Sequence, residues 1–192
     1  MRNRATVTHL AGALSTVRTH GVLLAVAPAM VFALLTAVGA QIRVPLPFTP
    51  VPVTFQTFFV FLAGGLLGAR RGAFSQVLYL SLGTMGLPVF ALGSAAILGP
   101  TGGYLIGFAV SALLVGRLTA GHRGTSLVWT AGAMGLGLGV IYLLGTIQLM
   151  ALAPIGLGHA VCLGVLPFLV GDVAKLALAA GIVVTARRRS AI

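Results

Sequence analysis

The chain has 192 residues, of which 58% are hydrophobic and only 7% are charged, and its mean hydropathy is +1.11. A soluble domain carries roughly 25% charged residues, so this chain has too few charges to cover a surface that faces water. The composition therefore excludes an ordinary soluble domain and predicts an integral protein of the lipid bilayer.

The charge is strongly basic, with twelve Lys and Arg residues against one acidic residue and a net charge of +11. In a soluble protein this excess would suggest a nucleic-acid partner, but here the cations separate long uncharged runs, as in membrane proteins. We therefore expect no nucleic-acid partner. The single cysteine, Cys162, excludes an intrachain disulfide, and no Cys/His cluster has the spacing of a metal site.

The number of spans follows from the length of the apolar region, because a transmembrane helix needs about 20 apolar residues. Six helices with short loops fit into this region, whereas eight do not. The sequence thus predicts an all-α membrane protein, a compact bundle of six transmembrane helices in one substrate-binding domain over residues 21–186. Basic cytoplasmic tails are expected over residues 1–20 and 187–192, and helices near residues 22–42, 54–69, 72–86, 102–116, 126–148 and 160–186.

The cations also predict the orientation of the bundle. With both termini in the cytoplasm, ten of the twelve Lys and Arg residues lie inside, as the positive-inside rule requires; Arg43 falls outside and Lys175 lies within the last span. A cleaved signal peptide ending near Ala37 to Ala40 is the alternative for the first apolar stretch. That stretch is longer than the core of a signal peptide and is followed by more membrane segments, which favours a retained helix.

Two segments interrupt the helical pattern. Residues 43–56 contain Pro45, Pro47, Pro50 and Pro52, which remove backbone donors and bar a helix. A second break, with Gly and Pro at both ends, spans residues 86–103. Both segments fall on the external side, and irregular apolar backbone at membrane depth persists only where it is buried or lines a cavity. They predict a covered binding site that opens outward, although an ordinary proline-stiffened loop remains the alternative for the first.

Small residues spaced by four predict close helix contacts. The first span carries such a strip of small residues. Two interpretations of this strip remain: it packs inside the bundle, or it contacts a separate membrane subunit. Pairs of glycines with the same spacing are expected to pack internally. The strip consists of Ala25, Ala29, Ala33 and Ala37, and the pairs are Gly64/Gly68, Gly103/Gly107 and Gly135/Gly139.

Asp172 is the only acidic residue of the chain, and Lys175 follows it on the same face of an apolar helix. Ionisable groups inside a span are costly, tend to pair and usually face a cavity, so the pair predicts a recognition site for a substrate or ion. The alternative is a pair that only locks the helix to its neighbours. Because the chain has no phosphate-binding loop and no hydrolase or metalloprotease motif, we expect no catalysis and no metal or cofactor.

Three segments resemble the BioY family, the biotin-specific S components of energy-coupling factor transporters. They are Pro50–Thr57 (PVPVTFQT), Gly99–Phe108 (GPTGGYLIGF) and Leu166–Lys175 (LPFLVGDVAK). The likeness runs from about Ala25 to Ala180. It implies a six-helix substrate-capturing subunit of the bacterial cytoplasmic membrane, which works with a transmembrane coupling subunit (EcfT or BioN type) and cytoplasmic ATPases (EcfA or BioM type). Within the alanine strip, Ala29 and Ala33 best match the family's contact with the coupling subunit.

The resemblance also implies biotin as the ligand, whose ureido ring, carboxylate and apolar body suit the available side chains. Asp172 is expected to accept hydrogen bonds from the ureido N–H groups, and either Lys175 or Arg43 is expected to bind the carboxylate. Supplementary polar contacts are expected from Gln56, Thr54 and Tyr104, and apolar walls from Phe48, Phe55 and Phe90. An S component for another vitamin, a stand-alone secondary transporter and a small membrane enzyme remain alternatives, and a homo-oligomer stays open.

Overall fold

The computed structural model describes residues 26–190, so the expected basic leader, Ala25 and the last two residues lie outside the described part. The first helix is described over Val26–Gln41, and a short antiparallel hairpin follows it. The further elements are β1 (Arg43–Val44), β2 (Val53–Thr54), α2 (Gln56–Leu67), α3 (Ala69–Thr84), η1 (Ser94–Ile97), α4 (Gly102–Leu118), η2 (Gly121–Thr125), α5 (Leu127–Leu152), α6 (Leu157–Gly164) and α7 (Leu166–Ser190).

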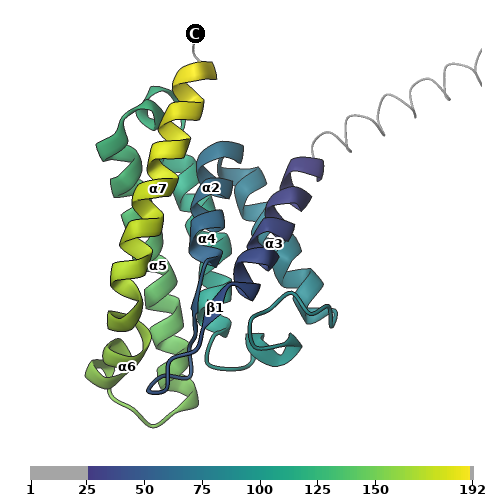
Figure 1. Ribbon diagram of the computed structural model, residues 1–192, viewed down its shortest axis with the longest axis vertical. Coiled ribbons are helices and arrows are strands. Elements are labelled where there is room, and N and C mark those ends of the chain that lie inside the picture. Colours follow the sequence, from purple (N-terminus) through teal and green to yellow (C-terminus); the bar gives the residue numbers. More distant parts are fainter. Residues whose placement is uncertain (1–25, 191–192) are drawn as a thin grey trace, which may run out of the picture.

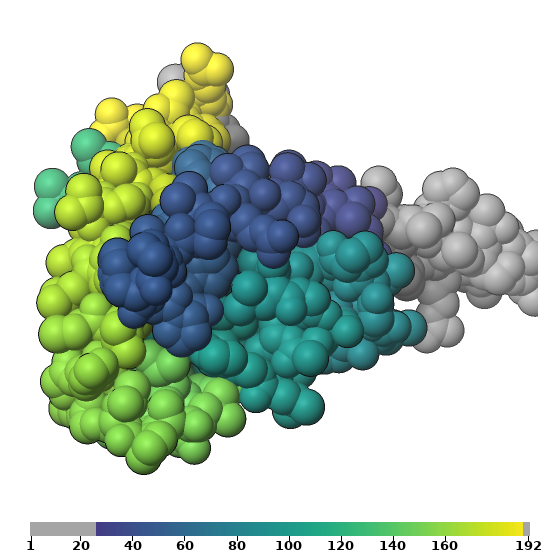
Figure 2. Space-filling view, turned by 60° about the horizontal axis from the view of Figure 1, so that its bottom comes forward, coloured from purple at the N-terminus to yellow at the C-terminus, as the bar shows by residue number. Residues whose placement is uncertain are grey.

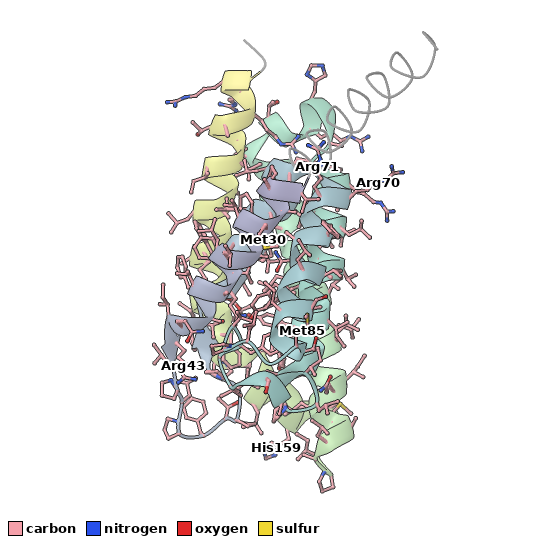
Figure 3. The ribbon with its side chains drawn as sticks, turned by 90° about the vertical axis from the view of Figure 1, so that its right-hand side faces the viewer. Met30, Arg43, Arg70, Arg71, Met85 and His159 are labelled. Carbon is pink, nitrogen blue, oxygen red and sulfur yellow. The ribbon has the colours of Figure 1, made fainter. Side chains whose placement is uncertain are left out.

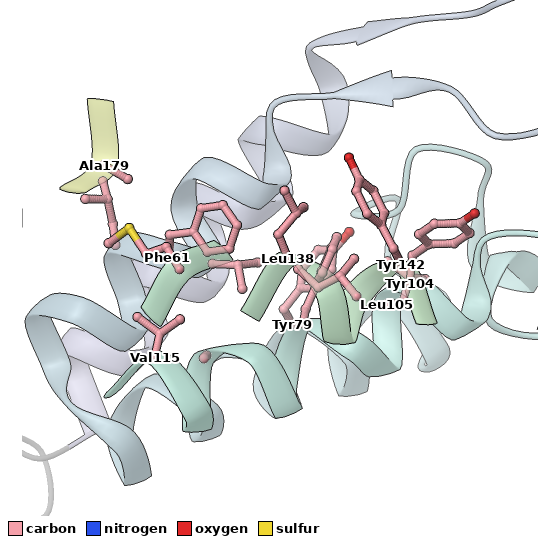
Figure 4. Close-up of a cluster of buried hydrophobic side chains, with 14 of the residues drawn as sticks. Phe61, Tyr79, Tyr104, Leu105, Val115, Leu138, Tyr142 and Ala179 are labelled. Carbon is pink, nitrogen blue, oxygen red and sulfur yellow. The ribbon is translucent and has the colours of Figure 1, made fainter. Parts of the chain in front are cut away.

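The helices form a bundle whose long elements run along the long axis of the molecule (Figure 1). Helix α4 packs against α2, α3 and α5, and α2 also contacts α7. Buried side chains from these helices form one core, with Phe61, Val115 and Ala179 toward one end and Tyr104 and Tyr142 toward the other (Figure 4). The core therefore becomes more polar toward one end of the bundle.

The turn between α2 and α3 consists of one residue, Gly68, which has φ of +80° and ψ of 178°. This conformation is essentially restricted to glycine, because a Cβ atom would clash with the backbone. The sharp turn lets α3 pack directly against α2.

The expected helices up to residue 152 agree with the structure to within a few residues, but the expected helix over 160–186 is wrong in detail. The chain forms two helices there, α6 and α7, which are separated by Val165 with φ of −128° and ψ of −60°. Pro167 lies in the first turn of α7, the only part of a helix that tolerates its missing N–H. Helix α7 also continues through Arg187 to Ser190, where a tail was expected.

Two helices are long and apolar enough to cross a bilayer by length and composition, Leu127–Leu152 and Leu166–Arg189. Shorter apolar helices span Val26–Gln41, Gln56–Leu67 and Gly102–Leu118. Together with the low charge content, these helices make the chain a mostly helical membrane protein.

The described part of the alanine strip faces the inside of the bundle. Ala29 and Ala33 are fully buried, and Ala37 is also buried. The first helix packs on α3, where Thr36 and Gln76 exchange side-chain hydrogen bonds of 3.3–3.4 Å. Internal packing is therefore the arrangement of this strip in the isolated chain, and its contact with a coupling subunit stays a prediction.

The glycine pairs divide into packed and exposed positions. Gly103 and Gly107 lie against the backbone of α5, as expected. Gly135 and Gly139, in contrast, have no atom within 4 Å of where a Cβ would lie, so the prediction of internal packing is wrong for them. Spacing placed both on one face of α5, and that face lies on the outside of the bundle.

The Arg and His side chains labelled in Figure 3 lie at two opposite ends of the helical bundle. Arg70 and Arg71 lie at the end that carries the C-terminus of α7, whereas Arg43 and His159 lie at the opposite end, with the hairpin and α6 (Figure 3). The hairpin, α6 and the segment between α3 and α4 gather at that opposite end (Figure 1).

Candidate functional site

A cavity of about 60 Å³ lies at the hairpin end of the core. Its wall combines apolar side chains with a few polar ones, which is the usual pattern of a small-ligand site. The lining residues are Val51, Pro52, Thr54, Gln56, Thr57, Phe90, Ala91, Ala96, Thr101, Tyr104, Leu105, Phe108, Ile141, Tyr142, Phe168, Asp172 and Lys175.

Both irregular segments predicted from the sequence cover this cavity. The hairpin contributes Val51, Pro52 and Thr54, and the segment between α3 and α4 contributes residues around Phe90 and Ala96. On the molecular surface at this end, the hairpin adjoins both that segment and α6 (Figure 2). We call these two segments, residues 42–55 and 85–101, the covering segments.

Side-chain hydrogen bonds from Arg43, Thr49 and Gln148 help to hold the covering segments in place. The Arg43 guanidinium donates to the carbonyl oxygen of Ala91 and so joins the two segments. The Thr49 hydroxyl donates to the Leu163 carbonyl at 2.8 Å, which ties the hairpin to α6.

The third tie comes from α5. The Gln148 amide donates to the carbonyl oxygens of Ile97 and Gly99, at 3.0 Å and 2.7 Å. A neutral hydrogen bond, such as those of Thr49 and Gln148, contributes about 1 kcal/mol, so each of these neutral ties is weak by itself.

Asp172 lies on α7 and is 4% exposed. Its Oδ1 accepts hydrogen bonds from the Thr57 hydroxyl at 2.8 Å and from the Lys175 ammonium at 2.7 Å. Its Oδ2 accepts one from the Tyr142 hydroxyl at 2.7 Å. An ionised carboxylate offers about four acceptor positions, so three are used and one, on Oδ2, is available to a ligand.

Lys175 is 8% exposed and lines the same cavity. Its Nζ donates to Asp172 and also to the Thr54 carbonyl of the hairpin, at 2.6 Å. The salt bridge between α7 residues therefore also holds β2, and the charge of the ammonium is compensated by a carboxylate 2.7 Å away.

Two further tyrosines support the polar wall: Tyr104 lines the cavity, and Tyr79, which does not, bonds the lining residue Gln56. The Gln56 amide donates to the Tyr79 hydroxyl at 2.7 Å, and Tyr79 in turn donates to the Val89 carbonyl at 3.1 Å. Tyr104 donates to the Gly164 carbonyl at 2.8 Å, and its ring packs directly on Gly145 of α5. These contacts fix the side chains before any ligand arrives.

Phe90 inserts from the covering segment into the wall. Its ring lies directly over Gly83 and makes an edge contact with the Tyr79 ring, with centroids 5.3 Å apart. The missing side chain at Gly83 creates the space for this ring.

The structure brings together most of the residues predicted for the site. Those that line the cavity are Asp172, Lys175, Gln56, Thr54, Tyr104 and Phe90. Three others do not line it. Phe48 is 59% exposed at the tip of the hairpin, Phe55 packs on Phe58 and Phe59, and Arg43 lies at the rim, bonded to Ala91.

Sequence reasoning missed the two hydroxyl donors to Asp172, Thr57 and Tyr142. They lie 115 and 30 residues away in the chain, on α2 and α5, and only the packing of these helices on α7 brings them together. A signal for Tyr142 was present, because it is the only tyrosine in the apolar stretch that forms α5. Thr57 directly follows the candidate Gln56 and gave no separate signal.

The site can accept one hydrogen bond at Asp172 and bury an apolar body. The three donors of the Lys175 ammonium are engaged by Asp172, Thr54 and Thr57, the last at 3.5 Å, so Lys175 can donate to a ligand only by giving up one of these bonds. Its present volume is below the roughly 300–1,000 Å³ of small-ligand pockets, so the covering segments must move apart to admit a ligand of vitamin size. Among the described residues, no group of three or more His, Cys, Asp or Glu could hold a metal ion.

Comparisons with known proteins agree in family and fold. The BioY family matches residues 7–191. The biotin transporter BioY of Thermotoga maritima is 41% identical over 153 residues, which cover 78% of this chain and 88% of that protein. The probable biotin transporter BioY of Pyrococcus horikoshii is 46% identical over 151 residues, covering 77% and 86%.

A solved structure has the same fold. It is the crystal structure at 2.1 Å of the S-component for biotin from an ECF-type ABC transporter, with a TM-score of 0.79 and 28% sequence identity. The match covers 88% of this chain and 93% of that chain.

Proposed function

Because the chain belongs to the BioY family, we propose that it is the membrane subunit that captures biotin from the external side for uptake into the cell. The observation that carries this proposal is the buried Asp172–Lys175 pair, which lines a cavity under two covering segments. A ureido group presents N–H donors beside a C=O acceptor, and the pair presents an acceptor beside a donor.

We propose that both members of the pair bind the same end of biotin. Asp172 Oδ1 and Lys175 Nζ are 2.7 Å apart, whereas the ureido ring and the carboxylate of biotin are separated by a second ring and an alkyl chain. An extended biotin cannot reach Asp172 with one end and Lys175 with the other. We therefore place the ureido ring at the pair, with Asp172 accepting from an N–H and Lys175 donating to the C=O.

The carboxylate then points toward the covering segments. Asp172 lies six residues into α7, about 9 Å from its first residue along the helix axis, and so lies deeper than the rim. Arg43 is at the rim, where its guanidinium bonds the backbone of Ala91, a lining residue. We propose Arg43 as the cation for the carboxylate, since the charge of Lys175 is already compensated.

A comparison of two ligands tests this placement. Biotin and its uncharged amide differ only at the carboxylate end. Arg43→Gln should weaken the binding of biotin about tenfold and leave the binding of the amide unchanged, whereas Lys175→Met should weaken both ligands alike. A charged hydrogen bond of about 1.5–3 kcal/mol gives this order of magnitude.

The matched control is Arg70→Gln, an exposed arginine at the other end of the molecule. It should change neither affinity. If Lys175→Met weakens biotin but leaves the amide untouched, the carboxylate binds Lys175 and the proposed placement is wrong.

In the membrane, we propose six crossings, with α6 and α7 together forming the last one. The end with Arg70 and Arg71 would face the cytoplasm and the hairpin end would face outward (Figure 3), in line with the positive-inside rule. This orientation opens the cavity to the exterior of a bacterial cytoplasmic membrane. Cysteine labelling from the outside tests it once the exposed Cys162 has been replaced by serine. On that background, a cysteine at exposed Phe48 should react and one at exposed Arg70 should not.

We propose that inward delivery is driven by a transmembrane coupling subunit and cytoplasmic ATPases, because the chain itself has no nucleotide-binding motif. Delivery requires two states with different affinity for biotin, since a ligand bound equally well in both would shift nothing. In vesicles, biotin should accumulate only when the complete module and internal ATP are present. Accumulation by the chain alone would support a stand-alone secondary transporter instead.

We keep the alanine strip as the proposed contact with the coupling subunit, which requires the first helix to move away from the bundle, because Ala29 and Ala33 are fully buried in the isolated chain. Ala33→Leu should abolish energised uptake, with Val38→Leu on the exposed face of the same helix as control. If Ala33→Leu instead abolishes biotin binding by the isolated chain, the strip serves internal packing alone.

A further inference from the structure

A second hollow lies far from the biotin cavity, on the outer surface where α4 ends and α5 begins. We call it the α4–α5 groove and define it by Leu118, Ser126, Val128, Trp129, Gly132 and Leu136. Its volume is about 520 Å³, and its wall is almost entirely apolar. Val128 is 83% exposed, and Leu136 and Trp129 are also exposed, so the groove is open to the surroundings of the bundle.

A cation lies at the mouth of this groove. The Arg123 guanidinium is 5.2 Å from the centroid of the Trp129 ring, and the ring is held by a hydrogen bond of 2.6 Å from its Nε1 to the Leu118 carbonyl. Among the described residues, Arg123 has this ring contact and no side-chain hydrogen bond. The nearby Arg188, in contrast, donates to a backbone carbonyl, that of Thr125.

Among the described residues, no carboxylate pairs with Arg123. The sequence has one acidic residue, and that residue, Asp172, is bonded to Lys175 inside the core. Arg117, on the last turn of α4 beside Leu118, adds a second exposed cation. A ligand for this place must therefore combine an anionic group with a long apolar part.

We propose that the α4–α5 groove binds one phospholipid with an anionic headgroup. Its phosphate lies at Arg123, and an acyl chain runs along Val128, Gly132 and Leu136. Tryptophan is enriched where the polar and apolar parts of the bilayer meet, so Trp129 places the groove mouth at the depth of lipid phosphates. Gly132 has no side chain to fill the groove, and the space beside it is empty, since a Cβ at this position would meet no atom within 4 Å.

The test measures retained lipid by native mass spectrometry of the detergent-purified chain. Phosphatidylglycerol and phosphatidylcholine with the same acyl chains are offered at equal concentration. The wild type should retain phosphatidylglycerol, and Arg123→Gln should lower that retention about fivefold, the factor expected for one cation at an anionic membrane surface. Arg70→Gln, which removes an exposed cation that does not line the groove, should have no comparable effect.

Filling the groove provides a second variant with a matched control on the same helix. Gly132→Leu places a side chain in the groove, whereas Gly139→Leu places one on the α5 surface outside it, and neither position has an atom near the added Cβ. Gly132→Leu should lower phosphatidylglycerol retention and Gly139→Leu should not. Normal melting temperatures in both show that the fold is kept.

Three results would overturn the proposal. Equal losses in Arg123→Gln and Arg70→Gln would mean diffuse attraction of lipids to a basic surface. Equal retention in Gly132→Leu and the wild type would mean that no acyl chain occupies the groove. Unchanged lipid retention in Gly132→Leu with lost assembly of the coupling subunit would make the groove a protein interface.

Discussion

Replacing Asp172 by asparagine separates the structural role of the buried pair from its role in recognition. The change keeps the shape of the side chain but removes the charge that compensates Lys175, which is 8% exposed. Breaking a buried ion pair by removing one partner costs about 3–5 kcal/mol. We therefore expect Asp172→Asn to lower the free energy of unfolding by this amount.

Binding should fall as well, because the amide replaces the charged acceptor for the ureido N–H. A hydrogen bond to a charged group contributes about 1.5–3 kcal/mol, which corresponds to a rise in the dissociation constant of about 10- to 150-fold. The double variant Asp172→Asn/Lys175→Met removes both charges. Since replacing a whole buried pair is often neutral for stability, the double variant should regain stability without regaining binding.

Thermal unfolding and equilibrium binding of radiolabelled biotin, both in detergent, measure the two effects. Thr185→Val is the control, because this exposed hydroxyl on α7 donates only to a carbonyl of its own helix. If the double variant is folded and binds biotin as the wild type does, the pair is structural and the reasoning about recognition is refuted.

Three further variants probe the surroundings of the pair. Tyr142→Phe removes the donor to Asp172 Oδ2 and should weaken biotin binding about tenfold; unchanged equilibrium binding would show that this hydroxyl does not position the carboxylate. Gln148→Leu removes two hydrogen bonds to a covering segment and should speed biotin release by up to about 30-fold. The release rate is measured by chase with unlabelled biotin. An unchanged rate would show that these hydrogen bonds do not hold the covering segment over the site. The added methyl group of Gly145→Ala would overlap the Tyr104 ring. This variant should lower the unfolding free energy by about 1–3 kcal/mol and also lower the affinity for biotin. The control Gly139→Ala places its methyl group in open space and should lower neither. Equal melting temperatures for these two glycine variants would contradict the close packing of Tyr104.

Patterns of charge and of Gly and Pro predicted most of the fold. The prolines between residues 43 and 56 predicted the irregular segment, and the spacing of Asp172 and Lys175 predicted their shared face, because both properties are local. The break at Val165 was missed although Pro167 signalled it, since the surrounding residues are apolar enough for one long helix.

Properties that depend on the rotation of one helix against another could not be predicted in this way. The spacing of Gly135 and Gly139 gave a shared face but not its direction, and that face lies outside the bundle. The contacts of Thr57 and Tyr142 with Asp172 arise only when α2, α5 and α7 pack together. Arg43 was one of two cations expected for the carboxylate, beside Lys175, and the structure places it at the rim, bonded to a lining residue.

Biotin capture by this chain is tested most directly by equilibrium dialysis of the detergent-purified protein with radiolabelled biotin and unlabelled competitors. We predict saturable binding of one biotin per chain, which biotin and desthiobiotin displace because both retain the ureido ring, and which unrelated vitamins do not. Absence of binding by a folded chain, or equal displacement by an unrelated vitamin, would contradict a biotin-specific cavity at Asp172 and Lys175.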